Sequence, residues 1–176
     1  MTVPKPVKLS HDLDREALTC RAVIETPKGS RSKFDYDTES GLFLLAGLVP
    51  EGMTFPLNFG FIPSTKADDG DPLDVMVLHD ESIPVGVLVT IRLLGVIEGE
   101  QTEDAKTVRN DRLLAVTKCS HQYEHIKEID RLGKKFLDHL TQFWINYNAL
   151  KGKRFEVRGV HGPKRAAEAI KQASRH

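Results

Sequence analysis

The sequence has little cysteine and no long apolar run. Only Cys20 and Cys119 are cysteines among its 176 residues, and they form no C-x-x-C pair. A disulfide framework is therefore excluded. No apolar stretch reaches the length that spans a membrane, and residues 1–13 lack the core of a signal peptide. We therefore expect a soluble cytoplasmic protein with no membrane partner.

An excess of charge of either sign is also missing, because 25 Lys and Arg residues balance 25 Asp and Glu residues. Proteins that bind nucleic acid through a general basic field carry net positive charge. We therefore expect no nucleic-acid partner. Repeats, low-complexity tracts and dividing linkers are absent as well, and the length suffices for one full hydrophobic core. Residues 1–176 are expected to form a single domain.

Short apolar segments bounded by Gly and Pro fill most of the first two-thirds of the chain. They predict strands over residues 20–25, 33–37, 42–45, 74–78, 87–95 and 112–116, with a late strand over 155–159. Between residues 130 and 150 the apolar positions recur every three or four residues, which predicts an amphipathic helix that ends near Gly152. Pro163 opens a short final helix through Ser174. This order predicts a small closed barrel with helices against one side.

The most informative segment is a cluster of acids that follows Asp68. It reads Asp-Gly-Asp-Pro-Leu-Asp from Asp69 to Asp74. Carboxylates this close repel one another and resist burial unless a cation neutralises them. Gly70 and Pro72 disfavour helix, so we expect a turn or strand edge, and carboxylate clusters suit hard ions such as Mg²⁺ or Mn²⁺. A solvated acidic loop is the alternative, but the apolar run that follows places the acids at the mouth of a buried strand.

Two further charged groups are candidates for the same site. The segment 98–106 carries several acids and a lysine just after a predicted strand, where they could hold a metal and a phosphate oxygen. A solvated hairpin would look similar. Glu25 and the segment 31–37 form the other group, and alternation puts the lysine and two aspartates of that segment on one face. A half-exposed strand explains this pattern, and so does a site in which carboxylates hold metals and an ammonium holds phosphate.

These three groups, in this order, resemble the family I soluble inorganic pyrophosphatases. The strongest match is the segment from Asp69 to Val75, which fits the family's signature of three metal-binding aspartates. Supporting matches are residues 23–27, 39–41, 55–62, 103–106 and 123–127. The resemblance runs from about Cys20 to the end of the long helix.

The resemblance implies a fold, an activity and a cofactor. The fold would be α+β, a five-stranded OB-like β-barrel with helices packed at the side. The activity would be the Mg²⁺-dependent hydrolysis of pyrophosphate to two phosphates, with Mn²⁺ as the alternative ion. Bacterial members of the family are commonly hexamers, so a homo-oligomer is expected too.

Carried over residue by residue, the family pattern assigns three roles. The residues that look like metal ligands are Asp69, Asp71, Asp74 and Asp104, with Glu25 nearby. Asp71 also looks like the general base that takes a proton from the attacking water. The residues that look like phosphate contacts are Lys33, Lys106 and Tyr147. This chemistry suits metal ions, which lower the pKa of bound water, and basic side chains, which stabilise the leaving phosphate.

The chain departs from the family pattern at several of these positions. Gly47 stands where the family has an arginine, Asn148 where it has a lysine, and Phe59 where it has a tyrosine. Asp35 stands where the family has a glutamate, and Gly99 aligns with the first metal-binding aspartate of the second acidic loop. Two basic phosphate contacts and one metal ligand are therefore missing from the pattern.

Two interpretations of these departures are open. In the first, Glu98 or Glu100 replaces the missing aspartate, and Arg109 or Arg112 replaces the missing bases. We take Glu100 as a metal ligand and Arg109 as the phosphate contact, because the turn signal at residues 110–111 would let Arg109 swing inward. In the second, the chain has weakened activity or a different phosphoanhydride substrate. The retained aspartate core favours the first interpretation.

Interpretations that assign the chain to other classes of protein rest on weaker sequence patterns. The segment His121-Gln122-Tyr123-Glu124-His125 fits the His-x-x-Glu-His pattern of one type of zinc protease, in which both histidines lie on one helical face. Exposed histidines on a charged helical turn would give the same five residues. A barrel that binds oligonucleotides would need an exposed aromatic and basic groove, and the neutral net charge counts against it.

Overall fold

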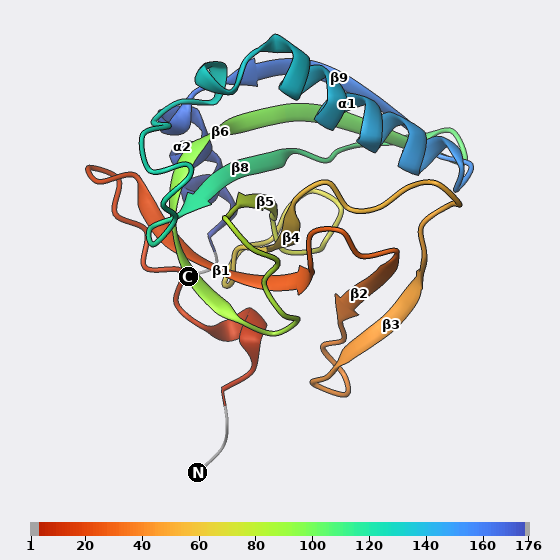
Figure 1. Ribbon diagram of the computed structural model, residues 1–176. Coiled ribbons are helices and arrows are strands. Elements are labelled where there is room, and N and C mark those ends of the chain that lie inside the picture. Colours follow the sequence, from red (N-terminus) through yellow and green to blue (C-terminus); the bar gives the residue numbers. More distant parts are fainter. Residues whose placement is uncertain (1–3, 175–176) are drawn as a thin grey trace.

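Among residues 4–174, the part of the chain that the structure describes, backbone hydrogen bonds close five strands into a ring. In this computed structural model the ring runs through β1 (Thr19–Thr26), β4 (Asn58–Phe61), β5 (Asp74–Leu78), β8 (Arg112–Thr117) and β6 (Leu88–Glu103), which pairs back with β1 (Figure 1). β5 and β8 are parallel, and the other neighbours in the ring are antiparallel. The fold is therefore α+β with a mixed sheet whose hydrogen bonding is ring-like.

The remaining elements surround this ring. β6 continues past it and pairs with β7 (Lys106–Arg109) and β9 (Arg154–His161). β2 (Ser32–Tyr36) and β3 (Phe43–Leu48) form a separate two-stranded sheet beside the ring (Figure 1). The helical elements are η1 (Pro6–Lys8), η2 (Ile129–Leu132), α1 (Lys134–Ala149) and α2 (Pro163–Ala173). Within the described part of the chain, no helix is long and apolar enough to cross a membrane.

Each of the seven predicted strands is present, and β5 has the predicted bounds. β6 runs to Glu103, eight residues beyond the predicted end, because its hairpin partner β7 extends the pairing. β4 and β7 were not predicted, since each has only four residues and neither alternates clearly between apolar and polar side chains. The long helix starts at Lys134, after Gly133, whose φ of +85° interrupts the helical backbone.

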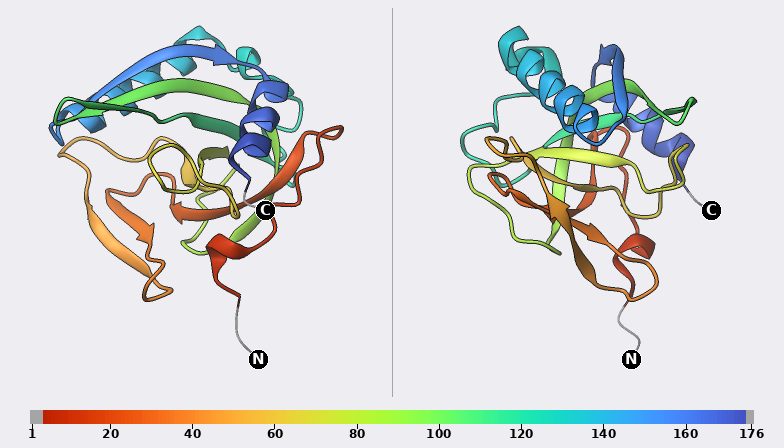
Figure 2. Two further views of the ribbon diagram at one scale, coloured as in Figure 1. Left: turned by 180° about the vertical axis from the view of Figure 1, so that it is seen from behind. Right: turned by 90° about the vertical axis from the view of Figure 1, so that its right-hand side faces the viewer.

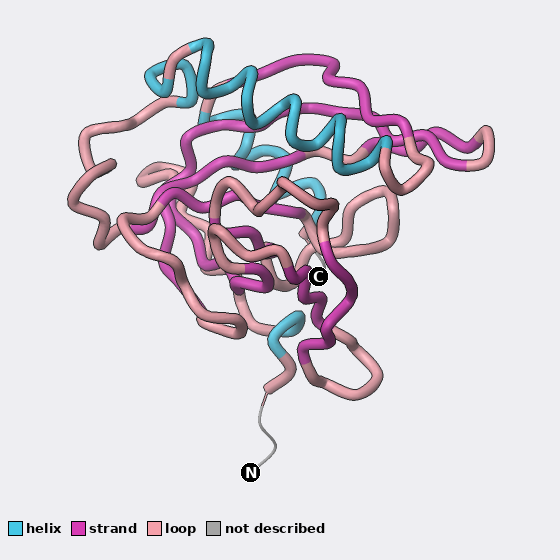
Figure 3. Tube along the Cα trace, turned by 45° about the vertical axis from the view of Figure 1, so that its right-hand side comes forward, coloured by secondary structure: helices cyan, strands magenta, loops and turns pink. Residues whose placement is uncertain are grey.

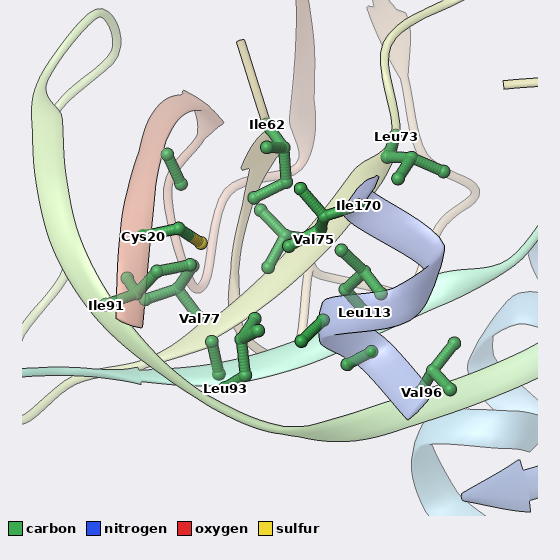
Figure 4. Packing of buried hydrophobic residues seen from close by; sticks show 14 of the residues in the cluster. Cys20, Ile62, Leu73, Val75, Val77, Ile91, Leu93, Val96, Leu113 and Ile170 are labelled. Carbon is green, nitrogen blue, oxygen red and sulfur yellow. The ribbon is translucent and has the colours of Figure 1, made fainter. Parts of the chain in front are cut away.

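Two hydrophobic clusters lie on opposite faces of the ring strands. On β5, Val75 and Val77 belong to one cluster, whereas Met76 and Leu78 belong to the other. The first cluster gathers residues from β1, β5, β6 and β8 around Ile170 of α2 (Figure 4). The second packs under α1, which lies across the strands at the top of Figure 3.

The sequence predicts that both helices pack against one side of the sheet. In the structure they do not. α1 and α2 belong to different clusters and stand on separate sides of the strands in the right-hand view of Figure 2. The reason is the alternation of side chains along β5 and β8, which makes both faces apolar, so each face needs its own cover.

Trp144 fixes α1 in place. Its ring lies 5.1 Å from that of Phe59 on β4, centroid to centroid, and its indole N–H donates to the sulfur of Met76 on β5 at 3.1 Å. Both contacts are buried, as is Tyr147 one turn further along the helix. The C-terminal end of α1 is thereby held over the ring.

Candidate active site

A cavity of about 470 Å³ lies where the β2–β3 sheet, the ring and the end of α1 meet. Most of its lining is polar, and it brings acids and bases together from across the whole sequence. The charged and amide side chains at its wall include Glu25, Lys33, Asp35, Asp69, Asp71, Asp74, Gln101, Asn110, Arg112, Lys151 and Lys153, with Tyr147 among the aromatic ones.

The acidic segment between β4 and β5 forms a tight turn. Gly70 has a φ of +92°, which disfavours any side chain, and the backbone N–H of Asp71 donates to Oδ1 of Asp69 at 3.0 Å. The backbone N–H of Ala67 closes the turn on the carbonyl of Asp71 at 2.7 Å. Desolvation and the charge of Asp69 raise the pKa of Asp71. The turn thus holds two carboxylates side by side at the cavity wall.

Asp74 opens β5 and faces Arg112, which opens β8, because the two strands pair in parallel register at these residues. A guanidinium nitrogen of Arg112 lies 2.5 Å from Oδ2 of Asp74. The Arg112 guanidinium carbon also lies 4.4 Å from the ring centroid of Trp144. Burial raises the pKa of Asp74 to about 6, although Arg112 acts in the opposite direction. Arg112 is 4% exposed, and its Nε has no hydrogen-bond partner among the described residues.

Glu25 lies at the end of β1 under the β2–β3 sheet. Its Oε1 accepts the backbone N–H of Tyr36 at 2.9 Å. Burial raises the pKa of Glu25 to about 8, and the nearby charges of Asp74 and Asp35 add to the shift. Lys33 is bonded to Asp35 on the same strand. This wall therefore carries a lysine between carboxylates, one of which resists ionisation.

The end of α1 contributes Tyr147 and the turn that follows it. Burial raises the pKa of Tyr147, and its hydroxyl oxygen accepts a hydrogen bond from Nζ of Lys151 at 2.7 Å. Asn148 is buried, and its side-chain amide donates to the carbonyl of Trp144 at 2.8 Å. Asn148 lines the cavity, but its amide N–H is used within the helix and it brings no positive charge to the site.

The structure places Asp104 and Lys106 at the tip of the β6–β7 hairpin. Asp104 and Ala105 have φ values of +48° and +62°, the pattern of a two-residue hairpin turn. Both Asp104 and Lys106 are exposed. They line an adjoining cavity of about 510 Å³ that shares Asp69 and Asp71 with the first. These two predicted residues thus approach the aspartate turn from outside the main cavity.

Glu100 and Arg109 are not brought to the main cavity. Glu100 is paired with Arg158 of β9 at 2.6 Å. Arg109 binds Oδ2 of Asp111 at 2.7 Å and Oε1 of Glu98 at 3.1 Å. The arginine that lines the main cavity is instead Arg112, the alternative that the sequence left open.

Gly99, which aligns with a metal-binding aspartate of the family, has no room for a side chain. A Cβ at position 99 would lie 2.4 Å from the ring of Phe155, so this position is closed by the core. The side chains that reach the cavity from this hairpin are Gln101 and Asn110, whose amides bond to each other at 2.8 Å. Sequence reasoning missed both, because uncharged amides do not stand out among the acids and bases of this segment and the two meet only through the pairing of β6 with β7.

The zinc-protease pattern has no structural support. Residues 121–125 form bends and turns rather than a helix, so the two histidines do not share a helical face. The backbone N–H of His121 instead donates to the carboxylate of Asp80 at 3.0 Å.

The side chains of the main cavity have the chemistry that a divalent cation prefers, although they are not gathered around one point. Over residues 4–174, no three His, Cys, Asp or Glu side chains lie close enough together to hold a metal ion. The donors are nevertheless carboxylates, as hard cations prefer, and burial raises the pKa of both Asp71 and Asp74 because it disfavours their charged forms.

The fold and the site together define an α+β protein with a ring-like sheet and a main cavity that is lined by both acids and bases. The family model described as inorganic pyrophosphatase matches residues 22–176. The chain belongs to the inorganic pyrophosphatase family.

Individual relatives match over nearly the whole chain. The inorganic pyrophosphatase of Helicobacter pylori strain 26695 is 32% identical over 170 residues, which cover 95% of this chain and 94% of that one. The inorganic pyrophosphatase of Thermus thermophilus is 34% identical over 163 residues, 90% of each chain. The crystal structure of inorganic pyrophosphatase from Thermus thermophilus superposes with a TM-score of 0.87 at 30% identity and covers 97% of both chains.

Proposed function

We propose that this protein hydrolyses inorganic pyrophosphate to two phosphates and that the reaction depends on Mg²⁺, with Mn²⁺ as the alternative ion. The observation that carries the proposal is the convergence of Asp69, Asp71 and Asp74 with Lys33 and Arg112 on a single cavity. Carboxylates suit the cation, and the ammonium and guanidinium groups suit the oxygens of a phosphoanhydride. Family membership supports the same activity.

The cation would be held by Asp69, Asp71 and Asp74, with Glu25 lining the same cavity and Asp104 in the adjoining cavity. When bound, it would neutralise the charge of pyrophosphate and make water easier to deprotonate. Asp74 enters this set already paired with Arg112. Asp69 and Asp71 are therefore the ligands whose negative charge a bound cation would neutralise most.

Asp71 is the general base in this proposal. Water adds to one phosphorus atom, the bond from that phosphorus to the bridging oxygen breaks, and Asp71 accepts the proton that the water loses. Asp71 lies at the cavity wall beside Asp69, in the turn that Gly70 shapes. Lys33, Arg112 and Tyr147 bind the phosphate oxygens, and Lys106 approaches from the adjoining cavity.

The test is the release of phosphate from pyrophosphate, measured with added Mg²⁺ and again after removal of divalent cations by a chelator. We expect release only with the cation. Asp71→Asn should lower the turnover by about 10²–10⁴-fold, the usual contribution of a general base, while the fold is kept. Asp68→Asn is the matched control, since Asp68 is adjacent to the turn but does not line the main cavity. Near-normal turnover of Asp71→Asn would place the base elsewhere.

A weakened enzyme, or one with another phosphoanhydride substrate, is the second candidate. It is favoured by the neutral amides Gln101 and Asn110 at the wall and by the pairing of Asp74 with Arg112. Comparing turnover of pyrophosphate with that of inorganic triphosphate under the same conditions separates the two. A higher kcat/KM for triphosphate would favour the second candidate.

We also propose that the ring of strands is an OB-like barrel and that the protein is a cytoplasmic homo-oligomer, of which a hexamer is one form. The closed pairing of β1 with β6 supports the first proposal. The balance of 25 basic and 25 acidic residues gives no support for a nucleic-acid partner.

A further inference from the structure

The turn after α1 carries two lysines that the family pattern did not assign. Lys151 and Lys153 flank Gly152, and both line the main cavity. The backbone carbonyl of Asn148 accepts the N–H groups of Lys151 and Lys153, each at 2.9 Å. This turn therefore has a defined shape, and it directs two ammonium-bearing side chains back toward the cavity.

Lys151 makes a specific contact there. Because it follows Tyr147 by four residues, the two side chains are neighbours at the end of the helix. Its Nζ donates to the Tyr147 hydroxyl at 2.7 Å and lies 4.4 Å from the centroid of the Tyr147 ring. When the hydroxyl oxygen accepts this bond, its own proton is free to be donated to an anion. The pair thus presents one ammonium and one hydroxyl donor.

Lys151 lies near two other positive charges of the cavity, those of Lys33 and Lys153. Burial, together with the positive charges of Lys33 and Lys153, lowers the pKa of Lys151. Lys33 and Lys153 each have a carboxylate partner, Asp35 and Glu103, whereas Lys151 has a phenol. An anion bound among these three ammonium groups would relieve their repulsion.

We propose that Lys151, together with Tyr147, forms a subsite for a phosphate group and supplies the basic contact that Asn148 lacks. This inference rests on the proposed function for the identity of the anion, a phosphoanhydride. Lys151 holds one phosphate of the substrate at the end of α1, while the aspartate turn, which lines the same cavity, holds the cation. The alternative is that Lys151 only packs on the ring of Tyr147.

Calorimetric titration with methylenediphosphonate, which cannot be hydrolysed, tests this subsite in the presence of Mg²⁺. Lys151→Met keeps an unbranched side chain and removes the ammonium group, so it should weaken binding about tenfold or more, as the loss of a charge-assisted hydrogen bond does. Lys151→Arg should restore most of the affinity. Lys135→Met is the matched control, because Lys135 is exposed on the same helix and does not line the cavity. It should bind within twofold of the wild type.

The outcomes separate this inference from the proposed function. If Lys151→Met binds the diphosphonate within twofold of the wild type, Lys151 only packs and the inference is wrong, whether or not the wild type hydrolyses pyrophosphate. If binding falls for Lys151→Met but the wild type releases no phosphate from pyrophosphate, the subsite stands and the proposed function fails. A wild-type protein that binds no diphosphonate would overturn the subsite. Thermal melts of each variant, followed by circular dichroism, check that all are folded.

Discussion

Cys20 and Cys119 are the same residue type in opposite surroundings. Burial raises the pKa of the Cys20 thiol to about 12, and Cys20 is 1% exposed, whereas Cys119 is exposed. Since the thiolate is the reactive form, we expect an aromatic disulfide reagent at pH 8 to modify only one thiol rapidly in the native protein. The second should react only after unfolding in guanidinium chloride.

Two variants assign the rapid reaction. Cys119→Ser should abolish the fast phase, and Cys20→Ser should leave its amplitude unchanged. A fast phase that survives in Cys119→Ser would mean that the first hydrophobic cluster opens readily around Cys20, contrary to its packing beside Ile91 and Val77.

At the residue scale, the sequence predicts the acids of the site better than its bases. The aspartates 69, 71 and 74 could be predicted because they are crowded within six residues and precede an apolar run. Arg112 and Lys151 could not be assigned in the same way. Arg112 acquires its role from the parallel register that sets it opposite Asp74, and Lys151 from the geometry of a helix end. For Lys151, the four-residue spacing from Tyr147 was the available signal.

At the element scale, Gly60 decides how closely two strands of the ring approach. A Cβ at this position of β4 would lie 1.9 Å from the backbone carbonyl oxygen of Val23 on β1. Backbone cannot move aside as a flexible side chain does, so Gly60→Ala should destabilise the protein by about 1–3 kcal/mol or more. Chemical denaturation of both proteins measures this difference.

Gly47→Ala is the control for this substitution. Gly47 lies in β3 with no atom within 4 Å of its missing Cβ, so its free energy of unfolding should change little. Equal stabilities of Gly60→Ala and Gly47→Ala would show that β1 and β4 are not held as closely as described.

The elements themselves differ in how far the sequence specifies them. β5 could be placed to the residue, because four apolar residues follow Asp74 and a turn precedes it. β4 could not, since its four residues are all buried and contain a glycine. The closure of the ring is also beyond local pattern, because it depends on pairings such as Ile91 with Cys20 that join segments distant in the chain.

At the scale of the whole molecule, the cavity forms only when segments distant in the sequence pack together. Its walls come from β1, β2, β4, β5, β6, β8 and the end of α1, so no single segment contains the site. β2 belongs to the two-stranded sheet outside the ring, and it contributes Lys33 and Asp35. Interactions that stabilise the β2–β3 sheet therefore also stabilise one wall of the cavity.

β3, the outer strand of that sheet, carries the largest group of exposed leucines among the described residues. Leu45 and Leu48 are 68% and 67% exposed, and Leu42 and Leu44 lie beside them. β3 pairs only with β2 within residues 4–174, so its other edge is unpaired. Exposed apolar patches and free edges of this kind are typical of interfaces.

We therefore expect the protein to self-associate through β3. Light scattering on a sizing column should give a mass well above the 19.7 kDa of one chain. Burial of each leucine contributes about 1.5–3 kcal/mol, so the double variant Leu45→Lys with Leu48→Lys should shift the population toward the monomer. Val160→Lys is the control, because Val160 is 42% exposed on β9, which does not pair with β3. If the wild type is an oligomer and the double variant keeps the same mass, the interface lies elsewhere. If the double variant dissociates and also loses affinity for pyrophosphate, association through β3 stabilises the cavity wall that carries Lys33.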